Sequence, residues 1–141
     1  MDQLINVIIV WLSLTSTVPV VHDHPQIRHV SPQRLVSIHY GPTLGNSQDR
    51  NVLGAYDASS RTIFLRDDWD SRKPADVSVL VHELVHYLQD MASQRFECPG
   101  VREAPAYAAQ QRWLQLYGSD LQTAFGIDAM TLKLRTACLP N

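Results

Sequence analysis

The sequence predicts a single α+β domain that spans residues 1–141, and three observations support this. Stretches with helical spacing of apolar residues occupy both halves of the chain, and two short strand candidates lie between them. Hydrophobic residues make up 45% and charged residues 18% of the chain, which are values of a globular protein able to bury its own core. Neither a repeat nor a Gly/Ser-rich linker divides the sequence.

The N-terminal segment from Leu4 to Leu14 is strongly apolar. Ile8 and Leu12 lie at helical spacing from Leu4, so we predict a helix that packs one broad face on the core. The alternative is an atypical or leftover export signal, although Asp2 stands where such a signal has a basic residue. The segment is too short to cross a bilayer, and no membrane span is predicted.

The next part of the chain contains short elements separated by turn residues. Ser31-Pro32 is a suitable first pair for a helix, and Gly41-Pro42 and Gly45-Asn46 mark the loop after it. Asp57 to Ser60 has the composition of a turn that joins two strands. The predicted elements are an extended stretch at 26–30, a helix to about residue 40, and strands at 52–56 and 62–66.

Helices dominate the second half of the chain. Pro74 fits the first turn of a helix that runs to about Ala92. Another long helix is predicted from Val101 to Tyr117, where Pro105 is tolerated because it falls in the first turn. Residues 120–137 are expected to form one or two short helices, broken at Gly126.

The most informative motif lies on the first of these two long helices and reads His82-Glu83-Leu84-Val85-His86. In a helix, the two histidines are about 40° apart around the axis and roughly 6 Å apart along it, so both rings can reach one ion. This is the HExxH pattern of zinc metallopeptidases, in which the glutamate takes a proton from water. The alternative is a core helix whose polar residues find unrelated hydrogen bonds.

A catalytic zinc site needs a third protein ligand, and we predict Glu103. It opens the second long helix within Glu103-Ala104-Pro105-Ala106-Tyr107, far enough along for a loop to bring that helix back across the first. Asp90 is excluded, because ligands at 82, 86 and 90 of one helix would spread over about 12 Å. Two alternatives stay open: Glu103 as a surface carboxylate, and Glu97 as the ligand.

With these residues the chain resembles the gluzincin-type zinc metallopeptidases, in a small single-domain form. The resemblance covers about residues 52–117 and is specific at the two motifs alone. It implies a zincin-like fold, with a small mixed sheet packed on the active-site helix and the glutamate-bearing helix, and with an extra N-terminal helix here. It also implies that the strand Thr62 to Arg66 is the edge strand that pairs with an extended substrate.

The same resemblance implies one zinc ion per chain. Its ligands would be His82, His86 and Glu103, and Glu83 would be the general base in the hydrolysis of amide bonds. Tyr107, one turn past Glu103, is a candidate for stabilising the oxyanion, with a packing role as the alternative. The chain departs from larger members because it has no second helical domain to wall the cleft. We expect a monomer that acts on a peptide or protein.

Charge and cysteine content bear on partners and location. A formal net charge of −2 predicts no nucleic-acid partner. The two cysteines, Cys98 and Cys138, each lie near a proline in a loop or at the chain end, and we predict a disulfide between them. Such a bond indicates a periplasmic or secreted protein, whereas two free thiols would indicate the cytoplasm.

Three rival functions remain beside the zinc metallopeptidase. The first is a non-catalytic zinc-binding domain of the same fold, which keeps the metal for structure or interaction. The second is a hydrolase on this scaffold that acts on amides other than peptides. The third is an interaction module without metal.

Overall fold

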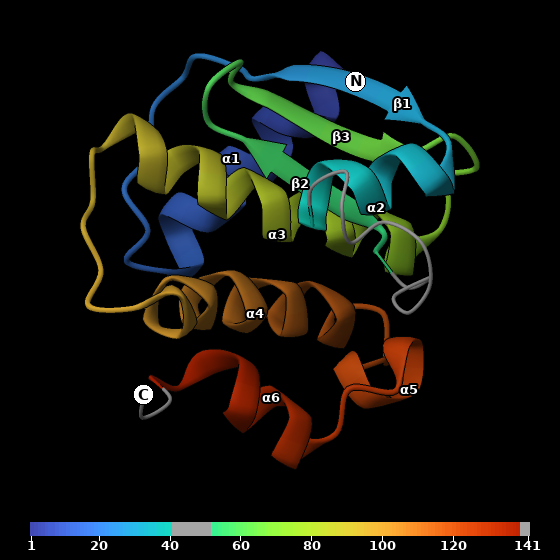
Figure 1. Ribbon diagram of the computed structural model, residues 1–141, viewed down its shortest axis with the longest axis vertical. Helices are drawn as coiled ribbons and strands as arrows, with labels where there is room; N and C mark the ends of the chain where they lie inside the picture. Colours follow the sequence, from blue (N-terminus) through green and yellow to red (C-terminus); the bar gives the residue numbers. More distant parts are fainter. Residues whose placement is uncertain (41–51, 139–141) are drawn as a thin grey trace.

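The computed structural model describes residues 1–40 and 52–138 (Figure 1). Within these residues six helices and three strands are present, which confirms the α+β class. The loop predicted at Gly41-Pro42 and Gly45-Asn46 lies outside the described residues. No helix in the described part is long and apolar enough to cross a membrane. The elements are α1 (Asp2–Thr15), β1 (Gln26–Val30), α2 (Pro32–Tyr40), β2 (Gly54–Asp57), β3 (Thr62–Arg66), α3 (Pro74–Met91), α4 (Pro99–Gln115), α5 (Leu121–Phe125) and α6 (Ala129–Thr136).

The three strands form one mixed sheet in the order β1-β3-β2. β1 pairs with β3 in parallel, with Ile27 opposite Ile63, and β2 pairs with β3 antiparallel, with Tyr56 opposite Ile63. The expectation that Thr62–Arg66 is an edge strand is therefore wrong. β1 comes from an earlier part of the chain and occupies the second side of β3, which leaves β2 and β1 as the edges.

The core lies between this sheet and α3. Along α3, Leu80, Leu84 and Leu88 are fully buried, and Ile63 and Leu65 of β3 contribute from the sheet. The N-terminal helix was correctly predicted to pack on this core. Its buried residues are Ile5, Ile8, Ile9 and Leu12. Because α3 is buried over most of its length, the histidine motif is held on a rigid element.

Helix α4 begins earlier than predicted. Cys98 is its extended N-cap residue and Pro99 lies in its first turn, where the fixed φ of proline favours a helix start. Pro105 therefore lies inside the helix and not in its first turn, which corrects the sequence-based assignment. α4 lies along α3, and α6 lies along the other side of α4 (Figure 1).

The C-terminal segment folds as two short helices broken at Gly126, as predicted. Asp120 caps α5 by accepting a hydrogen bond from the Thr123 amide at 2.7 Å, and Asp128 caps α6 through the Thr131 amide at 2.8 Å. Gly126 ends α5 with a left-handed φ of 67°, a conformation that glycine adopts without steric cost.

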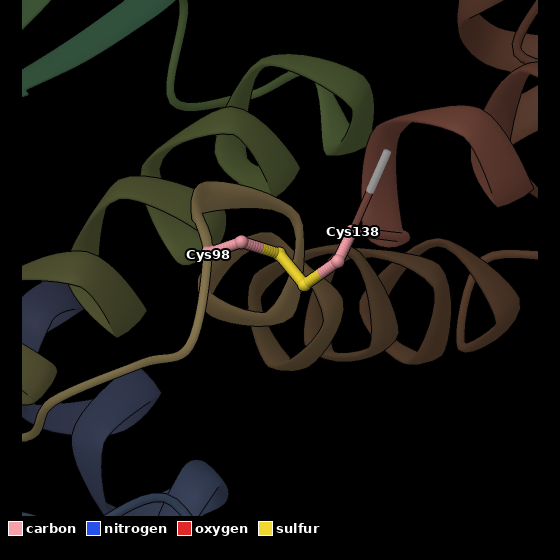
Figure 2. Close-up of a disulfide and its surroundings, with 2 residues drawn as sticks. All are labelled: Cys98 and Cys138. Carbon is pink, nitrogen blue, oxygen red and sulfur yellow. A yellow bond between two sulfur atoms is a disulfide. The ribbon is translucent and has the colours of Figure 1, made fainter. Parts of the chain in front are cut away.

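A disulfide joins the end of α6 to the start of α4. Cys98 and Cys138 are bonded with their Cα atoms 5.7 Å apart, which confirms the predicted pair (Figure 2). The backbone is also close here, because a Cβ on Gly100 would overlap the Ala137 carbonyl oxygen. α6 is thus tied to α4 at its C-terminal end. A disulfide of this kind is typical of an oxidising compartment.

Candidate metal centre

Two long helices bring three side chains together. His82 and His86 extend from one face of α3, with ring centroids 5.0 Å apart, and both are buried. Glu103 comes from the second turn of α4, and its Oε1 lies 2.9 Å from the Nε2 atoms of both histidines. One ligand atom from each of the three residues lies within 4.8 Å of the others. The triad is therefore compact enough for one metal ion, whereas Glu97 is exposed and lies outside it.

The opposite ring nitrogens of both histidines are also engaged. His82 Nδ1 lies 2.9 Å from Gln110 Oε1, and His86 Nδ1 lies 2.9 Å from Gln89 Oε1. An amide oxygen is only an acceptor, so both Nδ1 atoms carry a hydrogen. This arrangement directs the two Nε2 atoms toward Glu103 as possible ligands, as in metal sites whose histidines donate their other N–H to a neighbouring group.

The orientation of the two glutamine amides is itself fixed. Gln89 Nε2 donates to the Arg102 carbonyl at 3.0 Å, so its oxygen must face His86. Gln110 Nε2 donates to Ser78 Oγ at 3.3 Å, and that hydroxyl donates onward to the Ala75 carbonyl at 2.6 Å. Both histidines are therefore held in one tautomer by chains of hydrogen bonds that end on backbone carbonyls.

With hydrogens on Nδ1, the Nε2 atoms of the neutral histidines are acceptors, and so is the carboxylate oxygen that they face. A cation is therefore needed between these three atoms. Burial lowers the pKa of His82, but the hydrogen bond to Glu103 and the charges of Glu83 and Glu103 raise it on balance. Burial raises the pKa of Glu103, while its hydrogen bonds to His82 and His86 lower that pKa far below the usual range. A proton or a metal ion meets this need, and two imidazole nitrogens with one carboxylate oxygen form a donor set that suits zinc.

Glu83 follows the first histidine and faces the cleft described below. The residue is 8% exposed, and no described residue donates a hydrogen bond to its carboxylate. Gly54 of β2 passes close by, because a Cβ at that position would lie 3.3 Å from Glu83 Cγ and 2.7 Å from Val79 Cγ1. A buried carboxylate without a protein partner is suited to holding water.

The triad opens into a cleft of about 810 Å³. One wall is the edge of β2 that pairs with no other described strand, the floor is α3 and α4, and the residues after α4 supply a further wall. The C-terminal helices α5 and α6 thus contribute to the wall of the cleft. The lining residues outside α3 and α4 include Ile38, His39, Leu53, Gly54, Ala55, Tyr56, Phe125, Ile127 and Arg135.

Tyr107 lies beside the triad. Its ring packs edge-on against His82 with centroids 4.5 Å apart, and its hydroxyl accepts a hydrogen bond from Arg135 Nη1 at 3.1 Å. Burial raises the pKa of Tyr107, and the nearby Arg135 only partly offsets this. The hydroxyl therefore keeps its proton at neutral pH and, while accepting from Arg135, can still donate a hydrogen bond into the cleft.

Comparison with known proteins gives one family. A family model for a domain of unknown function, DUF6647, matches residues 1–141. The chain belongs to the DUF6647 family. No curated protein and no solved structure matches it. The function of this DUF6647 domain therefore has to be argued from its site.

Sequence reasoning missed several residues of this site. Gln110 lies seven residues after Glu103, two helical turns along the same face, and Gln89 lies three residues after His86. These spacings place each glutamine on the same helix face as a predicted ligand, and they could have indicated both residues. No local pattern pointed to Arg135, because its place depends on how α6 packs on α4. Asp90, excluded as a ligand by spacing, instead accepts a hydrogen bond from the Tyr56 hydroxyl at 2.5 Å.

Proposed function

We propose that this DUF6647 domain is a zinc-dependent hydrolase that cleaves amide bonds in peptides. His82, His86 and Glu103 would hold the zinc. One observation carries the proposal: both histidines donate Nδ1–H to fixed glutamines and direct Nε2 at the same carboxylate oxygen, on the floor of an open cleft. A purely structural zinc is usually enclosed by four protein ligands, whereas three are found among the described residues.

The proposed arrangement is zincin-like: a small mixed sheet above α3, with α4 supplying the third ligand. In place of Thr62–Arg66, β2 would be the substrate-binding strand. β2 pairs with β3 along one edge, and its other edge borders the cleft at Gly54, Ala55 and Tyr56. An extended peptide would add to this edge through backbone hydrogen bonds, with its scissile bond above the triad.

The chemistry would follow from the side chains around the triad. When bound, zinc supplies Lewis acidity, which polarises a carbonyl and makes water a stronger acid. Glu83, buried at the cleft with no hydrogen-bond donor among the described residues, would accept a proton from water and pass it to the leaving amine. The Tyr107 hydroxyl would donate to the developing oxyanion, because burial keeps it protonated.

The test has a metal readout and an activity readout. We expect about one zinc per wild-type chain by elemental mass spectrometry after mild zinc loading. Glu103→Ala should lose zinc, whereas Glu97→Ala, which removes an exposed carboxylate of the loop before α4, should retain it. Glu83→Gln should retain zinc and lose about 10²- to 10⁴-fold in the rate of peptide hydrolysis.

Each outcome has a distinct meaning. Absence of zinc from the wild type would refute the metal centre, and with it the proposed hydrolase function. Zinc binding that depends on Glu103, with no hydrolysis across a peptide library, would favour the non-catalytic zinc domain. Hydrolysis by Glu83→Gln at the wild-type rate would remove Glu83 as the base. The disulfide supports action in the periplasm or outside the cell, and we propose that the chain acts as a monomer.

A further inference from the structure

Arg135 stands out among the charged groups that line the cleft. Among the described lining residues, Arg102 and Arg135 carry a permanent positive charge. The acidic ones, Glu83 and Glu103, already have roles in the proposed hydrolysis. Of the two arginines, Arg135 is held in place by a hydrogen bond from its Nη1 to the Tyr107 hydroxyl. Tyr107 in turn packs against His82, so the arginine is tied to the metal centre through a single side chain.

The Arg135 guanidinium has donors left over. A guanidinium carries five N–H groups, and among the described residues the one hydrogen bond that Arg135 makes is the bond to Tyr107. No described carboxylate lies within ion-pair distance of it. Two arginines away from the cleft differ in this respect, because Arg66 pairs with Asp68 at 2.9 Å and Arg72 with Asp70 at 3.0 Å. Within residues 1–40 and 52–138, the Arg135 guanidinium therefore has no carboxylate partner, and it has N–H donors left over at the cleft wall.

The fold also restrains the helix that carries this arginine. Three residues after Arg135, Cys138 is bonded to Cys98 at the start of α4 (Figure 2). The backbone of Ala137 also lies directly against Gly100. Asp128 caps the other end of α6. A capped helix that is tied to α4 at its C-terminal end holds its side chains with a lower entropy cost on binding than a free C-terminal tail would.

We propose that Arg135 binds a carboxylate of the substrate, which makes this site selective for peptides that carry a negative charge near the scissile bond. A guanidinium pairs with a carboxylate through two parallel hydrogen bonds, and this geometry gives direction as well as attraction. The carboxylate has two sources, the C-terminus of the peptide or an Asp or Glu side chain. This inference rests on the proposed hydrolase function and adds the class of substrate.

Binding to an inactive protein tests the inference apart from turnover. The protein is zinc-loaded Glu83→Gln, and the probes are acetylated hexapeptides of alanine and leucine, measured by isothermal titration calorimetry. In the first pair, one peptide ends in a free carboxylate and the other in an amide. In the second pair both peptides end in an amide, and one has Glu where the other has Gln at an internal position. We expect the charged member of one pair to bind about tenfold more tightly, the scale of a charge-assisted hydrogen bond.

Variants of α6 assign the effect to Arg135. Adding Arg135→Gln should abolish the preference for the charged peptide. Lys133→Gln should leave it intact, because this exposed lysine lies on the same helix and carries the same charge but does not line the cleft. A preference in the first pair identifies the C-terminus as the source, and one in the second pair identifies a side chain.

The inference is overturned by equal affinity within both pairs, by a preference that survives Arg135→Gln, or by no binding of any probe. Because Arg135 is exposed, the variant is expected to fold, and circular dichroism checks this. Hydrolysis of the same peptides by the wild type is measured separately. Turnover without charge preference would refute the role of Arg135 alone, and binding with charge preference but no turnover would refute the hydrolase alone.

Discussion

Replacing Gln110 with leucine removes the acceptor that orients His82, together with the donor to Ser78 Oγ. Gln110 is 5% exposed, and its Oε1 is the acceptor for His82 Nδ1 at 2.9 Å. Leucine has a similar size, so the change removes the acceptor without opening a large cavity. The Nδ1–H of a buried ring is then left without a partner, and the ring is free to rotate or to change tautomer.

The expected magnitudes differ for the metal-free and zinc-bound proteins. An unpaired buried donor costs about 1–3 kcal/mol of unfolding free energy in metal-free Gln110→Leu. Loss of an outer hydrogen bond to a metal-binding histidine weakens metal affinity by about 10- to 100-fold, equivalent to about 1.4–2.7 kcal/mol. Zinc affinity is measured by competition with a chromogenic chelator, and stability by urea unfolding in EDTA.

Two further variants complete this experiment. Gln115→Leu makes the same change at an exposed position of α4 and should alter neither zinc affinity nor the free energy of unfolding. Gln110→Glu restores an acceptor at Nδ1 and should recover zinc affinity. Wild-type zinc affinity in a destabilised Gln110→Leu would refute the reasoning, because Gln110 would then serve packing and not the orientation of His82.

Three other perturbations follow from the same structure. Replacing Cys98 and Cys138 together by serine should lower the unfolding free energy by about 4 kcal/mol, because the bond closes a loop across a sequence separation of 40 residues; urea titration measures this. Gly54→Ala places a Cβ against Val79 and Glu83, so we expect a loss of about 1–3 kcal/mol and slower hydrolysis; unchanged stability would contradict the close packing of β2 on α3. In EDTA, the stabilising pair of His82 and Glu103 depends on pH. The pKa of Glu103 is lowered, so its contribution is present above its ordinary value of 4.5, and that of His82 is raised, so its contribution is present below 6.5. The difference in unfolding free energy between the wild type and Glu103→Gln should therefore be largest between pH 4.5 and 6.5 and shrink on either side; a difference independent of pH would contradict the ion pair.

Local elements of the fold were predictable because their signals are local. The spacing of Ile8 and Leu12 indicated that α1 packs on the core, and Gly126 marked the break between α5 and α6. Turn residues at Asp57 to Ser60 correctly joined β2 to β3. The start of α4 was misjudged by two residues, since the proline that initiates the helix is Pro99.

The position of β3 in the sheet was not predictable in this way. The parallel pairing of β1 with β3 joins residues 26–30 to residues 62–66, and no short pattern in either strand specifies that partner. The prediction that Thr62–Arg66 is an edge strand failed for this reason. The proposed substrate-binding edge is therefore that of β2, whose side away from β3 borders the cleft.

The sequence by itself determined which side chains could meet at one metal ion. Helical geometry places His82 and His86 on one face of α3, and a loop long enough to return the chain lets Glu103 reach them. Tertiary structure alone decided what surrounds them: Gln110 behind His82, β2 beside Glu83, and Arg135 across Tyr107. The difference is physical, because spacing along one helix follows from the backbone, whereas contacts between helices depend on how the whole core packs.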